Sequence, residues 1–195
     1  GNSALRNGER PLAAVRETTE IVRGLLARNL SDYRGKFFTM LESDHHSEWG
    51  TSLNFKPVRE RIPIFYGVKG KKLLKLAGAV ADGVLLTNPA TPAYIREART
   101  VIEAGAREAG RDLSDFTTAA FVTFSVGDDR EEARDAVRGM LATYVEHVGV
   151  EHSEILGLSQ KEVAAYQDAF ESGGVEAAVK LVKDDLIDRL TVAGT

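Results

Sequence analysis

The sequence contains no cysteine in its 195 residues. This absence excludes disulfide bonds and thiolate chemistry, although it does not fix the cellular compartment. No apolar run approaches the roughly 20 residues that a membrane-spanning helix requires, and no signal peptide is visible. We therefore expect a cytoplasmic protein that does not act at a membrane.

The sequence also lacks an excess of positive charge. It has 25 Lys and Arg against 29 Asp and Glu, a formal net charge of −4, whereas nucleic-acid binders usually carry a basic surface. Neither an internal repeat nor a low-complexity segment is present, and 43% hydrophobic with 28% charged residues is typical of a folded globular protein. We expect a single domain over residues 1–195, with no nucleic-acid partner.

The most informative segment spans residues 62–87. Its first five residues form a continuous apolar run, which is typical of a strand buried on both faces of a parallel sheet. Apolar residues then recur at helical spacing after two glycines, and a second apolar run follows. The predicted order is strand 62–66, a turn at Gly67 and Gly70, helix 71–81 and strand 83–87.

This order predicts a phosphate site. The two glycines let the chain turn sharply and leave its N–H groups uncovered, and a helix that begins near Lys71 directs its positive end above the sheet. The alternative is a plain strand-to-helix turn with solvated lysines. The spacing is not that of a P-loop, because no Ser or Thr follows Gly70 and Lys71.

The rest of the chain predicts an α/β protein with parallel strands and right-handed crossovers. Gly110 is expected to end a helix, and Asp128 with Asp129 to begin the next. Residues 29–61 form an insertion between regular elements, in which residues 32–38 could form a hairpin. The other predicted elements are helix 11–28, helix 91–109, strand 116–126, helix 129–149, and an all-helical end over residues 150–195 with helices 160–171, 175–182 and 186–190.

The central segment resembles the bacterial luciferase-like family of flavin and deazaflavin oxidoreductases, and above all its coenzyme F420-dependent branch. Two weaker likenesses flank it, at residues 1–4 and 186–195, while Asn2 and Lys71 depart from the family's aspartate and proline. The residues that carry the resemblance are Ile62-Pro63, Gly67, Gly70, Leu76-Ala77-Gly78 and Ala81-Asp82-Gly83-Val84.

The resemblance implies a (β/α)8 TIM barrel, of which this chain would be the interior and C-terminal part, without the first strands and the closing helix. It implies an oxidoreductase that transfers a hydride through bound coenzyme F420 to or from a small-molecule substrate. The alternatives are an FMN-dependent luciferase-like monooxygenase and a non-catalytic half-barrel that binds a phosphorylated ligand. An exposed barrel seam also predicts a homo-oligomer.

By the same resemblance the coenzyme phosphate would be bound at the turn and the start of the helix, and Thr87 at the end of the following strand would touch substrate or coenzyme. The catalytic residues remain unassigned, because the proton donors and ring contacts of such barrels come largely from earlier strands. The expected cofactor-binding residues are Gly67, Val68, Lys69, Gly70, Lys72, Leu73 and Thr87.

Other polar and aromatic residues have simpler interpretations. Adjacent histidines on a loop usually point apart, so we expect no metal at the group formed by Asp44, His45, His46 and Glu48. His147 and His152 flank a helix end and are expected to be surface or cap residues. Local packing of the insertion is expected for Tyr33, Phe37, Phe38 and Trp49.

Overall fold

The computed structural model describes residues 11–27, 32–41, 53, 55–59 and 61–195. The chain forms two compact units that alternate along the sequence. The single domain expected over residues 1–195 stays a prediction. Unit 1 comprises Gly1–Tyr66, Gly70–Val84 and Val101–Thr117, and unit 2 comprises Gly67–Lys69, Leu85–Thr100 and Thr118–Thr195.

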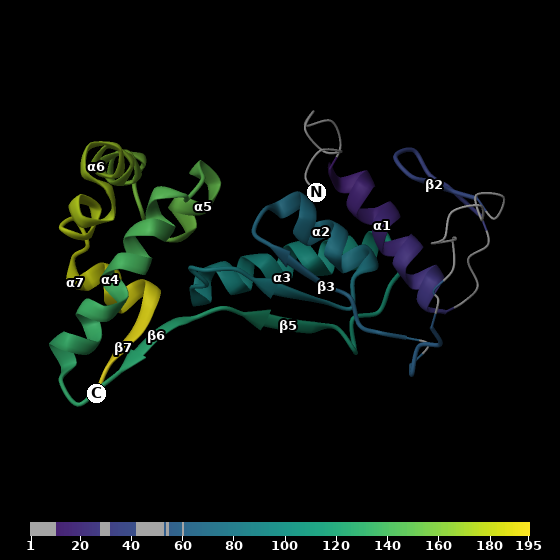
Figure 1. Cartoon of the computed structure of the whole chain (residues 1–195), viewed down its shortest axis with the longest axis horizontal. Helices are drawn as coiled ribbons and strands as arrows, with labels where there is room; N and C mark the ends of the chain where they lie inside the picture. Colours follow the sequence, from purple (N-terminus) through teal and green to yellow (C-terminus); the bar gives the residue numbers. More distant parts are fainter. Residues whose placement is uncertain (1–10, 28–31, 42–52, 54, 60) are drawn as a thin grey trace. The chain divides into compact units, whose positions relative to one another are not determined.

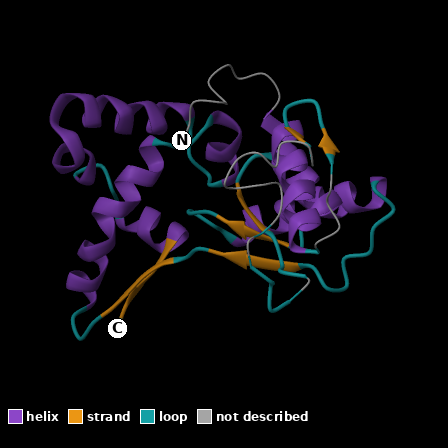
Figure 2. Ribbon diagram, turned by 45° about the vertical axis from the view of Figure 1, so that its right-hand side comes forward, coloured by secondary structure: helices purple, strands orange, loops and turns teal. Residues whose placement is uncertain are grey.

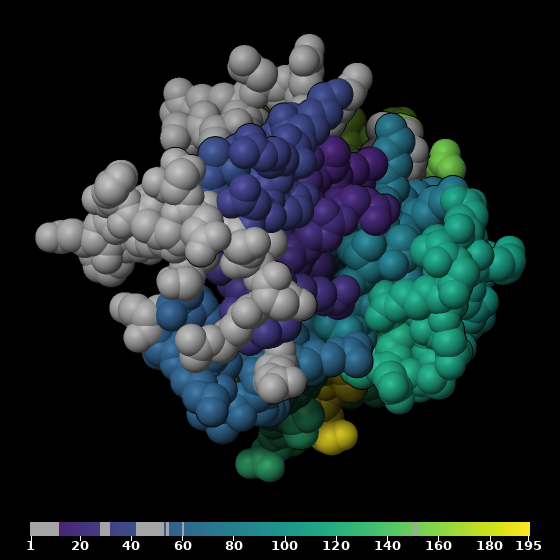
Figure 3. All heavy atoms as spheres, turned by 90° about the vertical axis from the view of Figure 1, so that its right-hand side faces the viewer, coloured from purple at the N-terminus to yellow at the C-terminus, as the bar shows by residue number. Residues whose placement is uncertain are grey.

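In unit 1 two helices and a short hairpin pack together. Helix α1 (Pro11–Leu26) packs against α2 (Lys71–Val80). The hairpin pairs β1 (Tyr33–Arg34) with β2 (Thr39–Met40) in antiparallel register, as expected within the insertion. The carboxylate of Glu17 accepts hydrogen bonds from three successive backbone N–H groups of residues 36–38, at 2.7, 2.9 and 3.0 Å. This buried carboxylate explains why the hairpin lies beside α1 (Figure 3).

A central sheet has the strand order β3-β4-β5. Its strands are β3 (Phe65–Val68), β4 (Gly83–Leu86) and β5 (Thr117–Ala120). The N–H of Asp82, before β4, donates to the carbonyl of Ile64, before β3, at 2.9 Å. The N–H of Phe121, after β5, donates to the carbonyl of Leu86 at the end of β4, also at 2.9 Å. The start of β3 thus lies beside the start of β4, and the end of β4 lies beside the end of β5. The three strands therefore run in the same direction, as the sequence predicts.

Close helix packing in unit 1 depends on two glycines. A Cβ at Gly78 of α2 would overlap the carbonyl of Ile102, and one at Gly105 would overlap the carbonyl of Lys75. Ile102 and Gly105 belong to α3 (Pro92–Glu108), which ends before Gly110, whose φ of 64° confirms the expected helix stop.

Unit 2 is built on a parallel pair of strands, β6 (Thr123–Val126) and β7 (Thr191–Gly194), seen as orange arrows near the C-terminus (Figure 2). Helix α4 (Arg130–Glu146) packs on this pair and on α6 and α7 (Figure 1). The remaining helices are α5 (Val150–Ile155), α6 (Gln160–Val179) and α7 (Asp184–Leu190).

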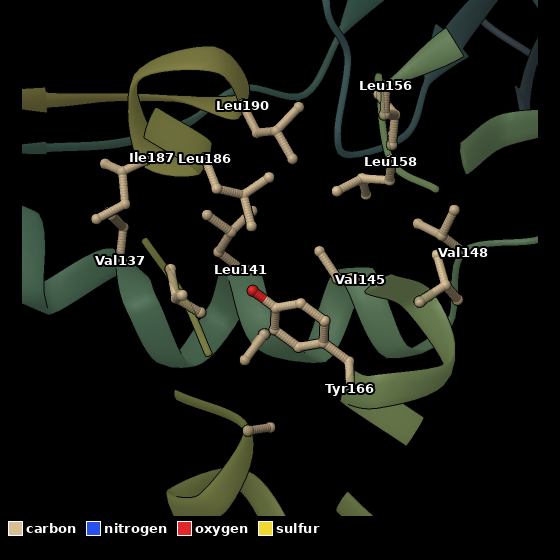
Figure 4. Packing of buried hydrophobic residues seen from close by; sticks show 14 residues of the cluster. Val137, Leu141, Val145, Val148, Leu156, Leu158, Tyr166, Leu186, Ile187 and Leu190 are labelled. Atoms are coloured by element: carbon tan, nitrogen blue, oxygen red, sulfur yellow. The ribbon is translucent and has the colours of Figure 1, made fainter. Parts of the chain in front are cut away.

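The core of unit 2 lies on the inner face of α4. Leu141 and Val145 of α4 are at most 1% exposed and face Tyr166 of α6 (Figure 4). The expected N-cap of α4 is present, since the Asp129 side chain accepts a hydrogen bond from the Glu132 N–H at 2.9 Å. Gly174, with φ 66°, interrupts α6 where the sequence predicts a break between two helices.

Three expectations about strands are wrong. The first strand begins at Phe65, not Ile62, because Pro63 has no N–H to donate to a ladder. Only one of its faces is buried, since Tyr66 and Val68 are buried whereas Phe65 is 44% exposed. The single strand expected over residues 116–126 is divided into β5 and β6, because the chain leaves β4 after Phe121 and pairs next with β7.

The expectation that residues 150–195 are all helical is also wrong in part. Between residues 150 and 190 the regular elements are the helices α5, α6 and α7, as predicted, but Thr191–Gly194 form β7 beside β6. The sequence gives no local sign of this pairing, because the partner strand lies more than sixty residues away. Among the described helices, none is long and apolar enough to cross a membrane.

Candidate functional site

The residues after β3 and β4 lie at the carboxyl edge of the central sheet, because these strands run in the same direction. Val68 ends β3 and is buried, and the half-buried Lys69 follows it. The half-buried Thr87 follows β4 at the same edge. Ligands of parallel sheets bind at this edge, so the location agrees with the predicted site.

The start of α2 has no side-chain cap, and Gly70 is its N-cap. The first N–H groups of any helix lack partners within it, and α2 has no acidic residue in its first turn to offset its positive end. The N–H groups of Lys69 and Gly70 likewise find no acceptor among the described residues. This segment can therefore donate several hydrogen bonds to an anion.

The two glycines differ from the expected turn. Gly67 lies within β3, and Gly70 has an extended backbone with φ −74° and ψ 142°, so neither needs the left-handed conformation. A Cβ at either position would meet no atom within 4 Å. The glycines therefore leave open surface beside the backbone and do not serve to turn it sharply.

The two lysines of the predicted site have different surroundings. Lys69 is half-buried, and burial lowers the pKa of its ammonium group. Lys72 is exposed and lines a cleft of about 620 Å³ in unit 1, together with Leu12 and Arg16 of α1. Leu73 is half-buried in the first turn of α2. Lys69 is thus the cation that directly follows the end of β3.

Tyr94, which was not among the residues expected from the sequence, supports the segment after β3. Its side chain is 2% exposed, and its hydroxyl donates toward the carbonyl of Lys69 at 3.1 Å and that of Val68 at 3.4 Å. Its own N–H donates to the Thr91 hydroxyl at 3.2 Å, which fixes it in the first turn of α3. Nothing in the local sequence marks this tyrosine, because its partners lie about 25 residues earlier.

Polar side chains also follow β4. The Asn88 side-chain amide donates to the Tyr144 hydroxyl of α4 at 3.1 Å, while its Oδ1 is buried without a partner among the described residues. The peptide bond between Asn88 and Pro89 is cis, and Pro89 is buried. The sequence predicts only a strand-end threonine here, at Thr87, so Asn88 and Tyr144 are additional candidates for ligand contact.

His152 is not the surface or cap residue that the sequence predicts. It is half-buried, and its ring contacts Tyr94 edge-on, with ring centres 4.3 Å apart and an interplanar angle of 83°. Burial, and then the charge of Lys69, lowers the pKa of His152. His147 agrees with its expected role as a surface or cap residue. It is the C-cap of α4, and its Nδ1 lies 2.9 Å from the Thr143 carbonyl.

A second polar cluster lies at the opposite end of β4, in unit 1. Asp82 is 7% exposed and accepts hydrogen bonds from Arg23 at 2.8 Å, Arg61 at 2.7 Å and the Ile64 N–H at 2.9 Å. Burial alone would raise the pKa of Asp82, but these three hydrogen bonds outweigh burial and lower it to about 2. This cluster joins the start of β4 to α1 and is a structural contact.

The remaining sequence candidates have no part in the described site. Asp44, His45, His46, Glu48 and Trp49 lie outside the described residues, which contain no group of three His, Cys, Asp or Glu placed to hold a metal. The hydroxyl of Tyr33 donates to Glu20 of α1 at 2.7 Å, so its recorded partner lies outside the insertion.

Comparison with known proteins identifies the family. Residues 4–195 match the luciferase-like monooxygenase family. A 5,10-methylenetetrahydromethanopterin reductase of Archaeoglobus fulgidus is 35% identical over 96% of this chain and 54% of its own length. The reductase of the same name from Methanopyrus kandleri is 30% identical over 94% of this chain and 50% of its own length.

Solved structures agree with this assignment. The coenzyme F420-dependent tetrahydromethanopterin reductase of Methanopyrus kandleri superposes with a TM-score of 0.80 and 28% identity, over 94% of this chain and 51% of that chain. An F420-dependent secondary alcohol dehydrogenase, at 23% identity and a TM-score of 0.63, shares the α/β fold. The chain spans about half the length of the relatives it matches. From the match over residues 4–195 and these likenesses, the chain belongs to the luciferase-like monooxygenase family.

Proposed function

We propose that this chain is the interior and C-terminal part of a (β/α)8 barrel that transfers a hydride through coenzyme F420. The observation that carries the proposal is the 35% identity, over 96% of this chain, to a 5,10-methylenetetrahydromethanopterin reductase. The likeness to an F420-dependent reductase at a TM-score of 0.80 supports the same coenzyme. The substrate would be a small molecule, and a cytoplasmic location and a homo-oligomeric state are parts of the proposal.

The residues after β3 fit a phosphate group. The N–H groups of Lys69 and Gly70 would donate to its oxygens, and the uncapped start of α2 would add its positive end. The Lys69 ammonium would pair with the negative charge, and the open surface at Gly67 and Gly70 leaves room for close approach. Each hydrogen bond to a charged group contributes about 1.5–3 kcal/mol, so this segment could account for much of the coenzyme affinity.

The other expected contacts have lesser parts. Val68 would keep the backbone of this segment in place. Leu73 and Thr87 would contact the ligand beside the phosphate, and the charge of Lys72 would attract the anionic ligand from a distance. When bound, F420 supplies the hydride from its deazaflavin ring, while the protein orients the ring and excludes competing reactions. None of the described residues is assigned a catalytic role.

A second candidate is an FMN-dependent monooxygenase, which the description of the matched family favours. FMN also carries a phosphate, so the same backbone donors would serve it. The third candidate is a half-barrel that binds a phosphorylated ligand without catalysis, which the coverage of about half of each relative keeps open.

Titration of the chain with F420 and with FMN, followed by visible absorbance and fluorescence, separates these candidates. We expect saturable binding of F420 at lower concentration than FMN. Binding of FMN alone would favour the monooxygenase, and binding of neither would favour a non-catalytic fragment. A titration of each coenzyme at high ionic strength serves as the control, because an interaction that depends on the phosphate should weaken with salt.

A further inference from the structure

The hydroxyl of Tyr94 lies behind the backbone that would hold the coenzyme phosphate. It is buried and donates toward the carbonyl of Lys69 at 3.1 Å, with the carbonyl of Val68 slightly farther at 3.4 Å. A tyrosine hydroxyl has a single proton, so the two carbonyls share it and Lys69 receives the larger part.

The geometry of the peptide group links this contact to the direction in which the neighbouring N–H groups point. In a planar trans peptide the carbonyl and the following N–H point in opposite directions. The carbonyls of Val68 and Lys69 face Tyr94, so the N–H groups of Lys69 and Gly70 must face away from it. These are the same two N–H groups that find no acceptor among the described residues.

Building on the proposed function, we propose that Tyr94 is a positioning residue, which orients the N–H groups of Lys69 and Gly70 toward the coenzyme phosphate. Tyr94 does not touch the ligand. It acts through the two peptide groups between Val68 and Gly70. Its substitution should therefore weaken the binding of the phosphate and not that of the rest of the coenzyme.

The surroundings of Tyr94 keep its ring and its proton in place. His152 packs edge-on against the ring at 4.3 Å, and Thr91 accepts a hydrogen bond from the Tyr94 N–H at 3.2 Å. Burial, with a smaller contribution from the charge of Glu97, raises the pKa of Tyr94 to about 12. The hydroxyl therefore remains a donor throughout the neutral range.

Tyr94→Phe tests the proposal, because it removes the hydroxyl and keeps the ring. Two probes are titrated into the full chain, coenzyme F420 and its phosphate-free ribityl deazaflavin. We expect F420 to bind about tenfold more weakly to the variant, since one orienting hydrogen bond is lost, and the phosphate-free probe to bind as before. Tyr166→Phe, which removes a buried hydroxyl from the core of unit 2, is the matched control and should change neither affinity.

Each other outcome overturns the inference. Unchanged F420 affinity in Tyr94→Phe would show that the hydroxyl does not orient the donors. An equal loss for both probes, or a variant that unfolds at the assay temperature, would show that Tyr94 only supports the fold. In all three cases the proposed function would stand, since it fails only if the unmodified chain does not bind F420.

Discussion

At the residue scale, the charge of Asp82 illustrates how unit 1 is held together. Arg23 and Arg61 contact its two carboxylate oxygens at 2.8 and 2.7 Å, and Arg111 lies 3.8 Å away. Asp82 is the buried member of this group, since its side chain is 7% exposed whereas those of Arg23 and Arg61 are 39% and 74% exposed. Asp82 also accepts from the Ile64 N–H, so the cluster ties the start of β4 to the residue before β3.

The lowered pKa of Asp82 predicts a loss of stability in acid. Its pKa of about 2 lies below the ordinary 3.8, so its contribution is complete above pH 4 and is lost as the pH falls toward 2. The difference amounts to about 2 kcal/mol of unfolding free energy. Asp82→Asn should lose about that amount at pH 7 and show a shallower decline between pH 4 and pH 2, as measured by urea unfolding.

Asp185→Asn is the control for this prediction. Asp185 is 68% exposed and pairs with Arg189 at 3.3 Å along one helix, so its loss should cost no more than about 0.5 kcal/mol. Equal destabilisation by the two substitutions would contradict the structural role assigned to Asp82.

Several important residues were beyond sequence analysis for one physical reason. The glycines and lysines after β3 could be proposed as site residues from the sequence, because backbone donors and charges within a few residues of one another form a recognisable pattern. Tyr94, Asn88 and His152 act through contacts with residues about 25 to 60 positions away. Their sequence neighbours indicate helix or loop only, and His152 was accordingly expected at the surface.

At the element scale, the start of α2 combines features that weaken the helix and favour an anion. Gly70 provides no capping side chain, and Lys71 and Lys72 place positive charge at the positive end. By contrast, α6 begins with a complete capping box between Ser159 and Glu162. The uncapped start of α2 therefore agrees with a site where the ligand supplies the missing negative charge.

Gly70→Asp should raise the unfolding free energy of the chain and lower its affinity for F420. Gly70 has an extended backbone and open space around its Cβ position, so aspartate can cap α2 and raise the unfolding free energy by about 1 kcal/mol. The new carboxylate should occupy the donors and repel the phosphate, so F420 binding should be lost. Thermal unfolding and F420 titration measure the two effects.

Gly149→Asp is the matched control, because Gly149 is the extended and uncapped N-cap of α5 with the same open space. It should leave F420 affinity unchanged. If Gly70→Asp bound F420 as tightly as the unmodified chain, the start of α2 would not be the phosphate site.

Helices were predicted more closely than strands. Hydrophobic periodicity gave α2 and α4 to within a few residues, because a helix forms its hydrogen bonds within its own sequence. A strand depends on its partner, so the boundary between β5 and β6 and the existence of β7 followed from pairing that no local pattern contains.

At the scale of the whole molecule, unit 2 exposes an apolar sheet face. One side of the β6–β7 pair packs on α4 and α7. On the other side Phe124, Val126 and Val192 are 72%, 73% and 61% exposed, and Phe124 lies directly opposite Val192. A contiguous apolar surface of this kind favours association.

We therefore expect the chain to self-associate at micromolar concentration, through the β6–β7 face. Phe124→Lys should shift the population toward monomer in light scattering. Val175→Lys, which replaces a 44% exposed apolar residue on α6, should not do so. A monomer for the unmodified chain would contradict the predicted homo-oligomer.

The family and the α/β class could be predicted from the block between Ile62 and Val84, because its glycines and its Ala81-Asp82-Gly83 turn are closely spaced and specific. The extent of the fold could not be predicted from this block. Closure of a barrel depends on strands that pair across the whole molecule, and this chain spans about half the length of its relatives. The partial barrel accordingly remains a proposal.

The proposed role of the Lys69 and Gly70 backbone N–H groups in holding the coenzyme phosphate can be observed by NMR. Backbone amide resonances are followed while the chain is titrated with F420 and with its phosphate-free deazaflavin. We expect the Lys69 and Gly70 resonances to shift with F420 and to stay in place with the phosphate-free probe. If F420 binds while both resonances remain unmoved, the phosphate lies elsewhere and the claim is wrong.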